Sequence, residues 1–221
     1  MKLCIISDTH NKHKQLGVLP EADVIIHCGD MTSVGKEHEV REFFKWFGKL
    51  DQFKYKICIA GNHDWLFERN GSFARSFVPS NVRYLEDSGI EIEGVKFYGT
   101  PVQRPFCNWA FNRPEEKLAE HWKAIPDDID VLITHDLPHT ILDYVLYGNE
   151  HVGSPSLYFE VTGRIRPVIH SYGHVHQGYG YKIIENTTFI NASNLDEQYM
   201  CVNKPFLVEL VDGKATILSH E

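Results

Sequence analysis

The chain has 221 residues, and its 22 lysine and arginine residues against 30 aspartate and glutamate residues give a formal net charge of −8. A hydrophobic content of 43% excludes a disordered chain and is enough for a sizeable core. The acidic balance argues against a protein that binds long nucleic acids, because that mode requires a clustered cationic face. We predict a single domain over residues 1–221.

The location of the protein is predicted from what the sequence lacks. No apolar run reaches the roughly 18 residues that a membrane-spanning helix needs, and the first residues do not have the pattern of a secretion signal. The five cysteines are an odd number without a C-x-x-C pair. We therefore expect a soluble protein in the reducing cytoplasm, without a membrane partner.

Short apolar runs alternate with segments of helical spacing through the first two thirds of the chain. In chain order, strands and helices are predicted over residues 2–7 (strand), 23–28 (strand), 36–50 (helix), 55–60 (strand), 94–98 (strand), 114–125 (helix), 130–134 (strand) and 167–172 (strand). Further strands are predicted at residues 181–185, 188–191, 206–210 and 215–219. The pattern indicates a mixed α/β protein with two sheets.

Five of these strands are continuous apolar runs, which favours burial on both faces, and each of the five ends in a polar cluster. The clusters are Asp8-Thr9-His10, Gly29-Asp30, Gly61-Asn62-His63-Asp64, Thr134-His135-Asp136 and Gly173-His174-Val175-His176. Ligands of open α/β sheets bind beyond the carboxyl ends of the strands. We therefore expect the five clusters to converge on one site.

The residue types in these clusters indicate metal binding. Carboxylates, one amide oxygen and several imidazoles together suit divalent ions such as Mn, Fe or Zn. In an extended segment, residues two apart point the same way, so both members of Asp8-x-His10 or of His174-x-His176 can face one cavity. Glycines before several of these residues allow a close approach of the backbone.

Taken together, the five motifs resemble the calcineurin-like metallophosphoesterases over residues 8–176. Residues 105–112, 173–180 and 188–193 are also similar to the metallophosphoesterase-domain-containing subgroup, whose vertebrate members are expressed in fetal brain. The resemblance implies two mixed sheets packed as a sandwich flanked by helices, a four-layer αββα fold. It also implies a phosphoric ester hydrolase with two divalent metal ions, with Mn²⁺ as the first choice and Fe or Zn as alternatives.

The resemblance also assigns roles to individual residues. It implies that Asp8, His10 and His176 hold one metal and that Asn62, His135 and His174 hold the other. Asp30 would bridge the two ions. His63 would contact the phosphate and protonate the leaving oxygen, with Asp64 beside it to orient the ring.

The aromatic segment at residues 106–112 allows two interpretations. Its rings either pack beneath a loop or stack against a nucleobase near the metal site. On the second interpretation, the substrate-side candidates are Asn62, His63, Arg104, Asn108, Trp109 and Asn112.

The leading functional hypothesis is a phosphodiesterase that acts on small nucleotides or cyclic nucleotides such as 2′,3′-cyclic ones. Two divalent cations ~3.5–4 Å apart can activate a bridging water, whose hydroxide attacks phosphorus. The alternatives are a phosphomonoesterase of the same fold and a non-catalytic protein-binding scaffold. The acidic charge disfavours a nuclease for long strands, and the sequence does not indicate the oligomeric state.

Overall fold

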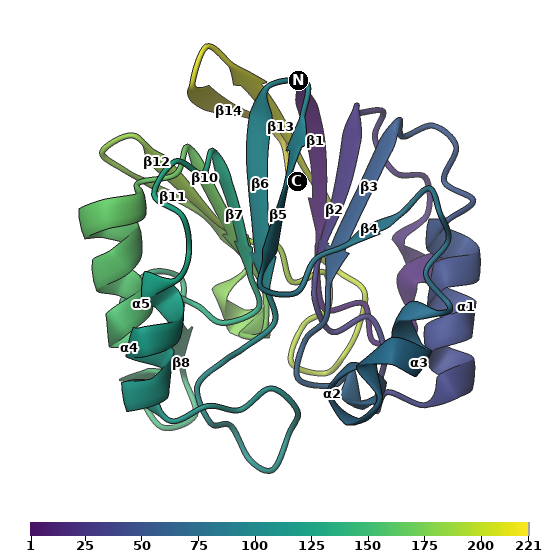
Figure 1. Cartoon of the computed structure of the whole chain (residues 1–221), viewed down its shortest axis with the longest axis horizontal. Helices are drawn as coiled ribbons and strands as arrows, with labels where there is room; N and C mark the ends of the chain where they lie inside the picture. The colour runs from purple at the N-terminus through teal and green to yellow at the C-terminus, as the bar shows by residue number, and fades with distance from the viewer. Residues whose placement is uncertain (221) are drawn as a thin grey trace.

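The buried apolar runs form the central strands of two stacked sheets (Figure 1) in a computed structural model that describes residues 1–220. The first sheet has six strands in the order β14-β13-β1-β2-β3-β4. Their bounds are β1 Lys2–Ile6, β2 Val24–Cys28, β3 Tyr55–Ile59, β4 Arg83–Tyr84, β13 Phe206–Val211 and β14 Lys214–Ser219. Strands β1 to β4 are parallel, and β13 and β14 extend the sheet in antiparallel pairing.

The second sheet also has six strands, in the order β11-β12-β10-β7-β6-β5. Their bounds are β5 Ser88–Ile92, β6 Val95–Thr100, β7 Val131–Thr134, β10 Ile169–Tyr172, β11 Gly180–Ile184 and β12 Thr187–Asn191. The four inner strands are parallel, and the two edge strands are antiparallel to their neighbours. A separate two-stranded hairpin consists of β8 (Tyr144–Val145) and β9 (Glu150–His151).

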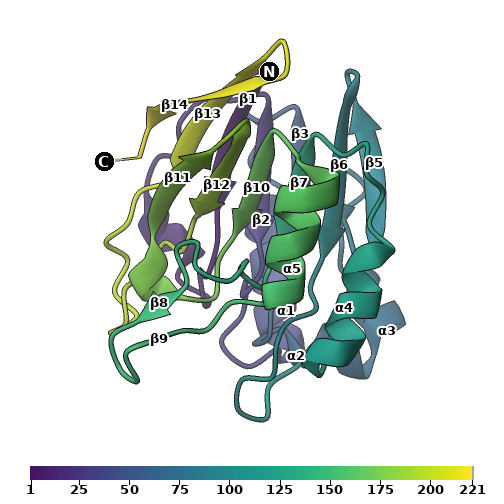
Figure 2. The same cartoon turned by 90° about the vertical axis from the view of Figure 1, so that its left-hand side faces the viewer.

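Helices cover the outer face of each sheet (Figures 1 and 2). Those on the first sheet are α1 (Glu37–Phe47), α2 (Trp65–Arg69) and α3 (Gly71–Arg75), and those on the second are α4 (Glu115–Lys123) and α5 (Pro155–Glu160). Three short turns of other helix types are η1 (His13–Leu16), η2 (Val161–Ile165) and η3 (His176–Gly178). Among residues 1–220, no helix has the length and apolar character needed to cross a membrane.

Three apolar clusters hold the four layers together. Between the sheets, Ile5 and Ile26 of the first pack with Ile133 and Ile169 of the second. On the outer face of the first sheet, α1 buries the apolar stripe Val40, Phe43, Phe44 and Phe47. On the outer face of the second, α4 and α5 bury Leu118, Trp122 and Leu157. Burial on both faces explains why the central strands are continuous apolar runs.

The predicted fold class is confirmed, with two mixed sheets flanked by helices. The predicted strands and the two predicted helices are present with shifted ends, and α1 stops at Phe47 because the chain turns at Gly48. The sequence did not predict α2, α3, α5, β4, β5 or the β8–β9 hairpin. None of these elements is a continuous apolar run, and none of the three helices is long enough to show a clear helical period.

Candidate functional site

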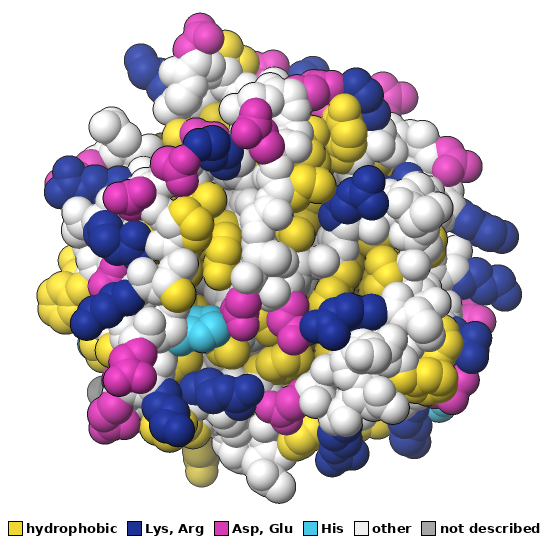
Figure 3. All heavy atoms as spheres, viewed as in Figure 1, with side chains coloured by type: hydrophobic (Ala, Val, Ile, Leu, Met, Phe, Trp, Pro, Cys, Tyr) yellow, Lys and Arg dark blue, Asp and Glu magenta, His cyan; other side chains and the backbone are white. Residues whose placement is uncertain are grey.

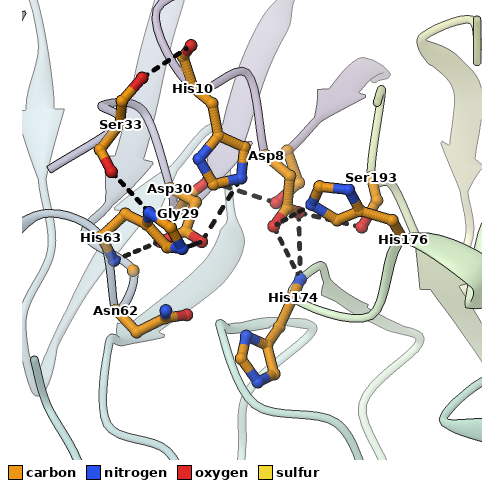
Figure 4. A network of polar contacts seen from close by, with 12 residues as sticks. Asp8, His10, Gly29, Asp30, Ser33, Asn62, His63, His174, His176 and Ser193 are labelled. Atoms are coloured by element: carbon orange, nitrogen blue, oxygen red, sulfur yellow. Dashed lines mark hydrogen bonds and ion pairs between the residues drawn. The ribbon is translucent and has the colours of Figure 1, made fainter. Parts of the chain in front are cut away.

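The five polar clusters meet at one edge of the sandwich, where the parallel strands of both sheets end, and Figure 4 shows residues of the clusters that follow β1, β2, β3 and β10. Loops after β1, β2 and β3 bring in one part of the site, and loops after β7 and β10 bring in the rest. Contacts join the two sheets directly. The His135 ring lies 3.0 Å from the Cys28 carbonyl, and the His174 backbone N–H donates to the Asp8 carboxylate at 3.0 Å. The predicted convergence is therefore confirmed across two sheets rather than one.

The first group of ligand-type side chains consists of Asp8, His10 and His176, whose ligand atoms lie within 4.8 Å of one another. His176 Nε2 is 3.6 Å from Asp8 Oδ1, and its Nδ1 lies 2.8 Å from the Asp196 carbonyl. A carbonyl only accepts, so Nδ1 carries the proton and Nε2 keeps its lone pair toward Asp8. Ser193 Oγ donates to Asp8 Oδ2 at 3.0 Å and fixes the carboxylate.

The second group consists of Asp30, His135 and His174, with Asn62 beside them. His135 Nδ1 donates to the Cys28 carbonyl, which leaves Nε2 directed into the site, where it can bind a metal once it has no proton. That Nε2 lies 3.4 Å from Asp30 Oδ2 and 2.9 Å from Asn62 Oδ1. Three electron-pair donors therefore converge on one point, as they do around a cation.

Asp30 belongs to the second group and also lies close to His10 of the first group. Its Oδ2 is 3.4 Å from His135 Nε2, 3.7 Å from His10 Nε2 and 4.0 Å from His63 Nε2. Figure 4 shows its carboxylate between the rings of His10 and His63. This central placement is the one that the bridging role requires.

The ring nitrogens of His10 give a second, independent reason to expect metal ions at this site. His10 is buried, and neither of its ring nitrogens has a hydrogen-bond partner within residues 1–220. Buried polar atoms without a partner are rare, and such an atom needs an explanation such as an ion. With oxygen and imidazole donors and no thiolate, the group suits Mn, Fe or Zn.

The protonation states of Asp30, His10 and His174 agree with this fit. Burial would raise the pKa of Asp30, but the charges of His135 and His63 outweigh it and hold that pKa well below its usual range. Burial lowers the pKa of His10 to about 4 and that of His174 to about 3. Ionised carboxylates and neutral imidazoles are the forms that bind metals. Burial also acts to lower the pKa of His135, but the negative field of Asp30 and Asp8 raises it to about 10.

Backbone geometry at the site is strained. Asp8, His10, Asp30 and His174 have positive φ angles of 52°, 39°, 55° and 69°. Non-glycine residues adopt this region uncommonly, and such strain gathers at functional sites. Two glycines serve the same packing: a Cβ at Gly173 would lie 1.9 Å from Asp8 Oδ2, and one at Gly29 would lie 2.5 Å from His135 Nδ1.

His63 lies beside the two groups and is held by contacts that the sequence did not reveal. Its Nδ1 is 2.6 Å from the Ser33 carbonyl, so Nδ1 donates and Nε2 faces Asp30. The ring stacks on Trp109 with centroids 3.9 Å apart and an interplanar angle of 24°. The backbone N–H of His63 donates to Asp30 Oδ1 at 2.8 Å.

Asp64 does not orient the His63 ring, and that part of the expectation is corrected. Its carboxylate instead accepts from the backbone N–H groups of Met31, Thr32 and Gly61 and from the Thr32 hydroxyl. Asp64 points into the loop after β2 because four donors converge there. Burial raises its pKa to about 7, with the charge of Asp30 adding to the effect.

We expect Asp64→Ala to lower the free energy of unfolding by about 3 kcal/mol, because several buried donors lose their acceptor. Urea unfolding followed by circular dichroism measures this change. If Asp64→Ala kept the wild-type stability but lost turnover, Asp64 would have a role in the chemical step instead.

Some of the predicted substrate residues line the cavity at the site and the others do not. Asn62, His63 and Arg104 line a cavity of about 590 Å³ above the site. Asn112 does not line this cavity. Its side chain accepts from Gln103 and donates to the Cys107 carbonyl, so its hydrogen bonds stabilise the loop to which it belongs. Trp109 is used as the stacking partner of His63, and neither Trp109 nor the exposed Asn108 lines the cavity. The aromatic rings on the cavity wall belong to Phe106, Tyr147 and Tyr199.

Several site residues escaped the sequence analysis. Ser193 holds Asp8, Ser33 holds His63, and Tyr199 packs its ring 5.0 Å from that of His10. Ser193 lies in a segment that the sequence resemblance includes, and that was its only signal. Ser33 acts through its backbone carbonyl, which no side-chain pattern reveals.

Comparisons with known proteins agree with this geometry. A family model described as calcineurin-like phosphoesterase matches residues 1–178. The chain is 36% identical to metallophosphoesterase domain-containing protein 1 of Homo sapiens, over 93% of this chain and 69% of that protein. It is also 36% identical to a UPF0046 protein of Caenorhabditis elegans, over 94% of this chain and 74% of the relative.

Solved structures share the fold. A hypothetical protein from Thermus thermophilus aligns with a TM-score of 0.54 at 10% identity, over 100% of this chain and 98% of that chain. Another crystal structure aligns with a TM-score of 0.70 at 18% identity, over 100% of this chain and 99% of that chain.

Proposed function

Because the chain belongs to the calcineurin-like phosphoesterase family, we propose that it hydrolyses phosphodiester bonds of small nucleotides, including 2′,3′-cyclic ones, with two divalent metal ions. One observation carries the proposal: a single buried carboxylate, Asp30, lies between two groups of ligand-type side chains and beside the His63 ring. That is the arrangement of a two-metal phosphoester site.

The ligand sets follow the two groups of the site. Asp8, His10 and His176 would hold one ion, Asn62, His135 and His174 would hold the other, and Asp30 would contact both. When bound, the ions supply positive charge at the phosphoryl oxygens and a water of lowered pKa. The donor set suits Mn²⁺, Fe or Zn, and we propose Mn²⁺ as the first choice.

His63 has the placement of a proton donor. Its Nδ1–H is committed to the Ser33 carbonyl, so Nε2 is the atom that carries or releases the second proton. Stacking on Trp109 fixes the plane of the ring. We assign His63 the protonation of the departing oxygen, which is a general-acid step.

The cavity supports a diester as the substrate. Its volume of about 590 Å³ is in the range of small-molecule sites and leaves room for an arm beyond the phosphate. Glu150 and Glu197 line it and outnumber the one basic side chain of its wall, Arg104. This excess of negative charge disfavours the second negative charge that a monoester carries near neutral pH.

Long nucleic acids are disfavoured as substrates. On the face in Figure 3, basic and acidic side chains are interspersed rather than gathered into a basic surface, and the net charge is −8. We therefore propose a small phosphodiester as the partner. The location remains our prediction of the cytoplasm, based on the cysteine pattern.

The proposal is tested with protein that has been stripped by chelator and reloaded with Mn²⁺. We expect metal-dependent hydrolysis of bis-p-nitrophenyl phosphate and 2′,3′-cyclic AMP to exceed that of p-nitrophenyl phosphate by at least about tenfold. A faster monoester reaction would favour the phosphomonoesterase alternative. No turnover with Mn²⁺, Fe²⁺ or Zn²⁺ would favour the protein-binding scaffold.

A further inference from the structure

A fifth imidazole lines the cavity, from the wall that the β8–β9 hairpin forms. His151 of β9 lines the same cavity as the ligand residues His10 and His174. From the sequence, His151 is expected on a surface or loop, without a catalytic role. The chemistry proposed above does not use it.

A buried carboxylate orients this ring. Asp143 is fully buried, and its Oδ1 lies 2.6 Å from His151 Nδ1. Its Oδ2 accepts from the backbone N–H groups of Thr140 and Gly153, at 3.0 and 2.9 Å. Because the carboxylate accepts all three bonds, Nδ1 of His151 is the protonated nitrogen. Nε2, at the far side of the ring, is left with a lone pair and has no hydrogen bond within residues 1–220.

The hairpin that carries His151 is anchored to the site on both sides. Arg104 donates to the carbonyls of Val152 and Gly153, at 2.9 Å each. On the other side, Gln177 accepts from the Leu146 N–H at 2.7 Å. The position of His151 relative to the metal-ligand groups is therefore fixed by hydrogen bonds, as a specific contact requires.

The surrounding charges indicate what His151 would contact. Glu150 and Glu197 line the same cavity and outnumber its one basic side chain, Arg104, whose guanidinium is bonded to the Val152 and Gly153 carbonyls, so a second phosphate there would be repelled. A lone pair on Nε2 accepts from hydroxyl or amino groups. The complementary group is an uncharged hydrogen-bond donor on the arm of the substrate, such as a hydroxyl of ribose or an amino group of a base.

We infer that His151, positioned by Asp143, is a specificity residue that accepts a hydrogen bond from the nucleoside arm of the substrate. The inference rests on the proposed function and names the residue that distinguishes a nucleotide from a bare phosphoryl group. A neutral hydrogen bond contributes modestly, and leaving a donor without an acceptor costs more. We therefore expect an effect of about tenfold on affinity.

His139 provides a matched control. Its Nδ1 is 3.7 Å from the Oδ2 of the same Asp143, its ring is 5.6 Å from that of His151, and its side-chain exposure of 38% is close to the 40% of His151. It does not line the cavity. Substituting His139 therefore repeats the change of residue type and local packing without removing the cavity contact.

The experiment measures calorimetric binding of 3′-AMP and of inorganic phosphate to the Mn²⁺-loaded full chain at pH 7.5. We expect His151→Ala to weaken 3′-AMP binding about tenfold and to leave phosphate binding unchanged, with His139→Ala altering neither. His151→Gln, whose Oε1 can accept a hydrogen bond, should recover part of the loss and covers the case in which the alanine variant fails to fold.

Three outcomes would overturn the inference. They are equal weakening of both ligands in His151→Ala, the same effect in His139→Ala, and wild-type protein that binds 3′-AMP no more tightly than phosphate. The measurement needs no turnover. Failure of the diesterase proposal would therefore show separately in the hydrolysis assay.

Discussion

His63→Gln should lower the turnover of 2′,3′-cyclic AMP by at least about 10²-fold while the metal content stays at the wild-type level. The reason is geometric. The ring lies next to Asp30 but outside both proposed ligand sets, and its Nε2 is 4.0 Å from Asp30 Oδ2. Turnover is measured by chromatography of the product, and metal content by atomic absorption on the dialysed protein.

Two substrates with different leaving groups distinguish a proton donor from other roles of His63. A ribose oxygen leaves as a strong base and needs a proton, whereas p-nitrophenolate is a weak base and needs it far less. The loss in His63→Gln should therefore be at most about tenfold with bis-p-nitrophenyl phosphate. His38→Gln, an exposed histidine on α1, serves as the control for the residue change. Equal losses on both substrates would rule out the role as proton donor.

Asp30→Asn should remove metal from both positions and reduce diester hydrolysis by at least about 10²-fold. Its Oδ2 lies within 4.0 Å of ring nitrogens of three histidines, so the negative charge it contributes is shared by both groups. The amide oxygen can still accept the His63 N–H, so the loop after β3 should keep its conformation.

The readout for Asp30→Asn is the number of ions per chain, measured together with the rate at saturating Mn²⁺. Asp51→Asn is the control for the residue change, since Asp51 is exposed and belongs to neither ligand set. That control should retain two ions per chain. An Asp30→Asn protein with wild-type metal content and rate would disprove the bridging role.

Local sequence patterns identified the strands and the residues at their ends. The five apolar runs are β1, β2, β3, β7 and β10, and every motif residue of the proposed ligand sets follows one of them. Both features depend on neighbouring residues alone. A strand that is buried on both faces needs an unbroken apolar run, and polar residues can follow only where that strand ends. The residue types of the proposed metal site could therefore be predicted before any contact was known.

The environment of each side chain was decided by tertiary structure. Neighbours in sequence suggested Asp64 as the partner of His63, but the ring bonds to the Ser33 carbonyl because the loops after β2 and β3 lie side by side. The aromatic segment left open whether its rings pack within the protein or stack on a base, and Trp109 packs on His63. Both outcomes come from contacts between loops, which spacing along one loop does not encode.

By itself, the sequence determined the central strands, the residue types of the site and the family resemblance. Only the stacking of two sheets decided how those residues combine, since His135 meets Cys28 across 107 positions and His174 meets Asp8 across 166. It also set the β8–β9 hairpin, with His151, against the same cavity. The physical reason is that strand formation depends on nearby residues, whereas the cavity depends on which buried surfaces pack together.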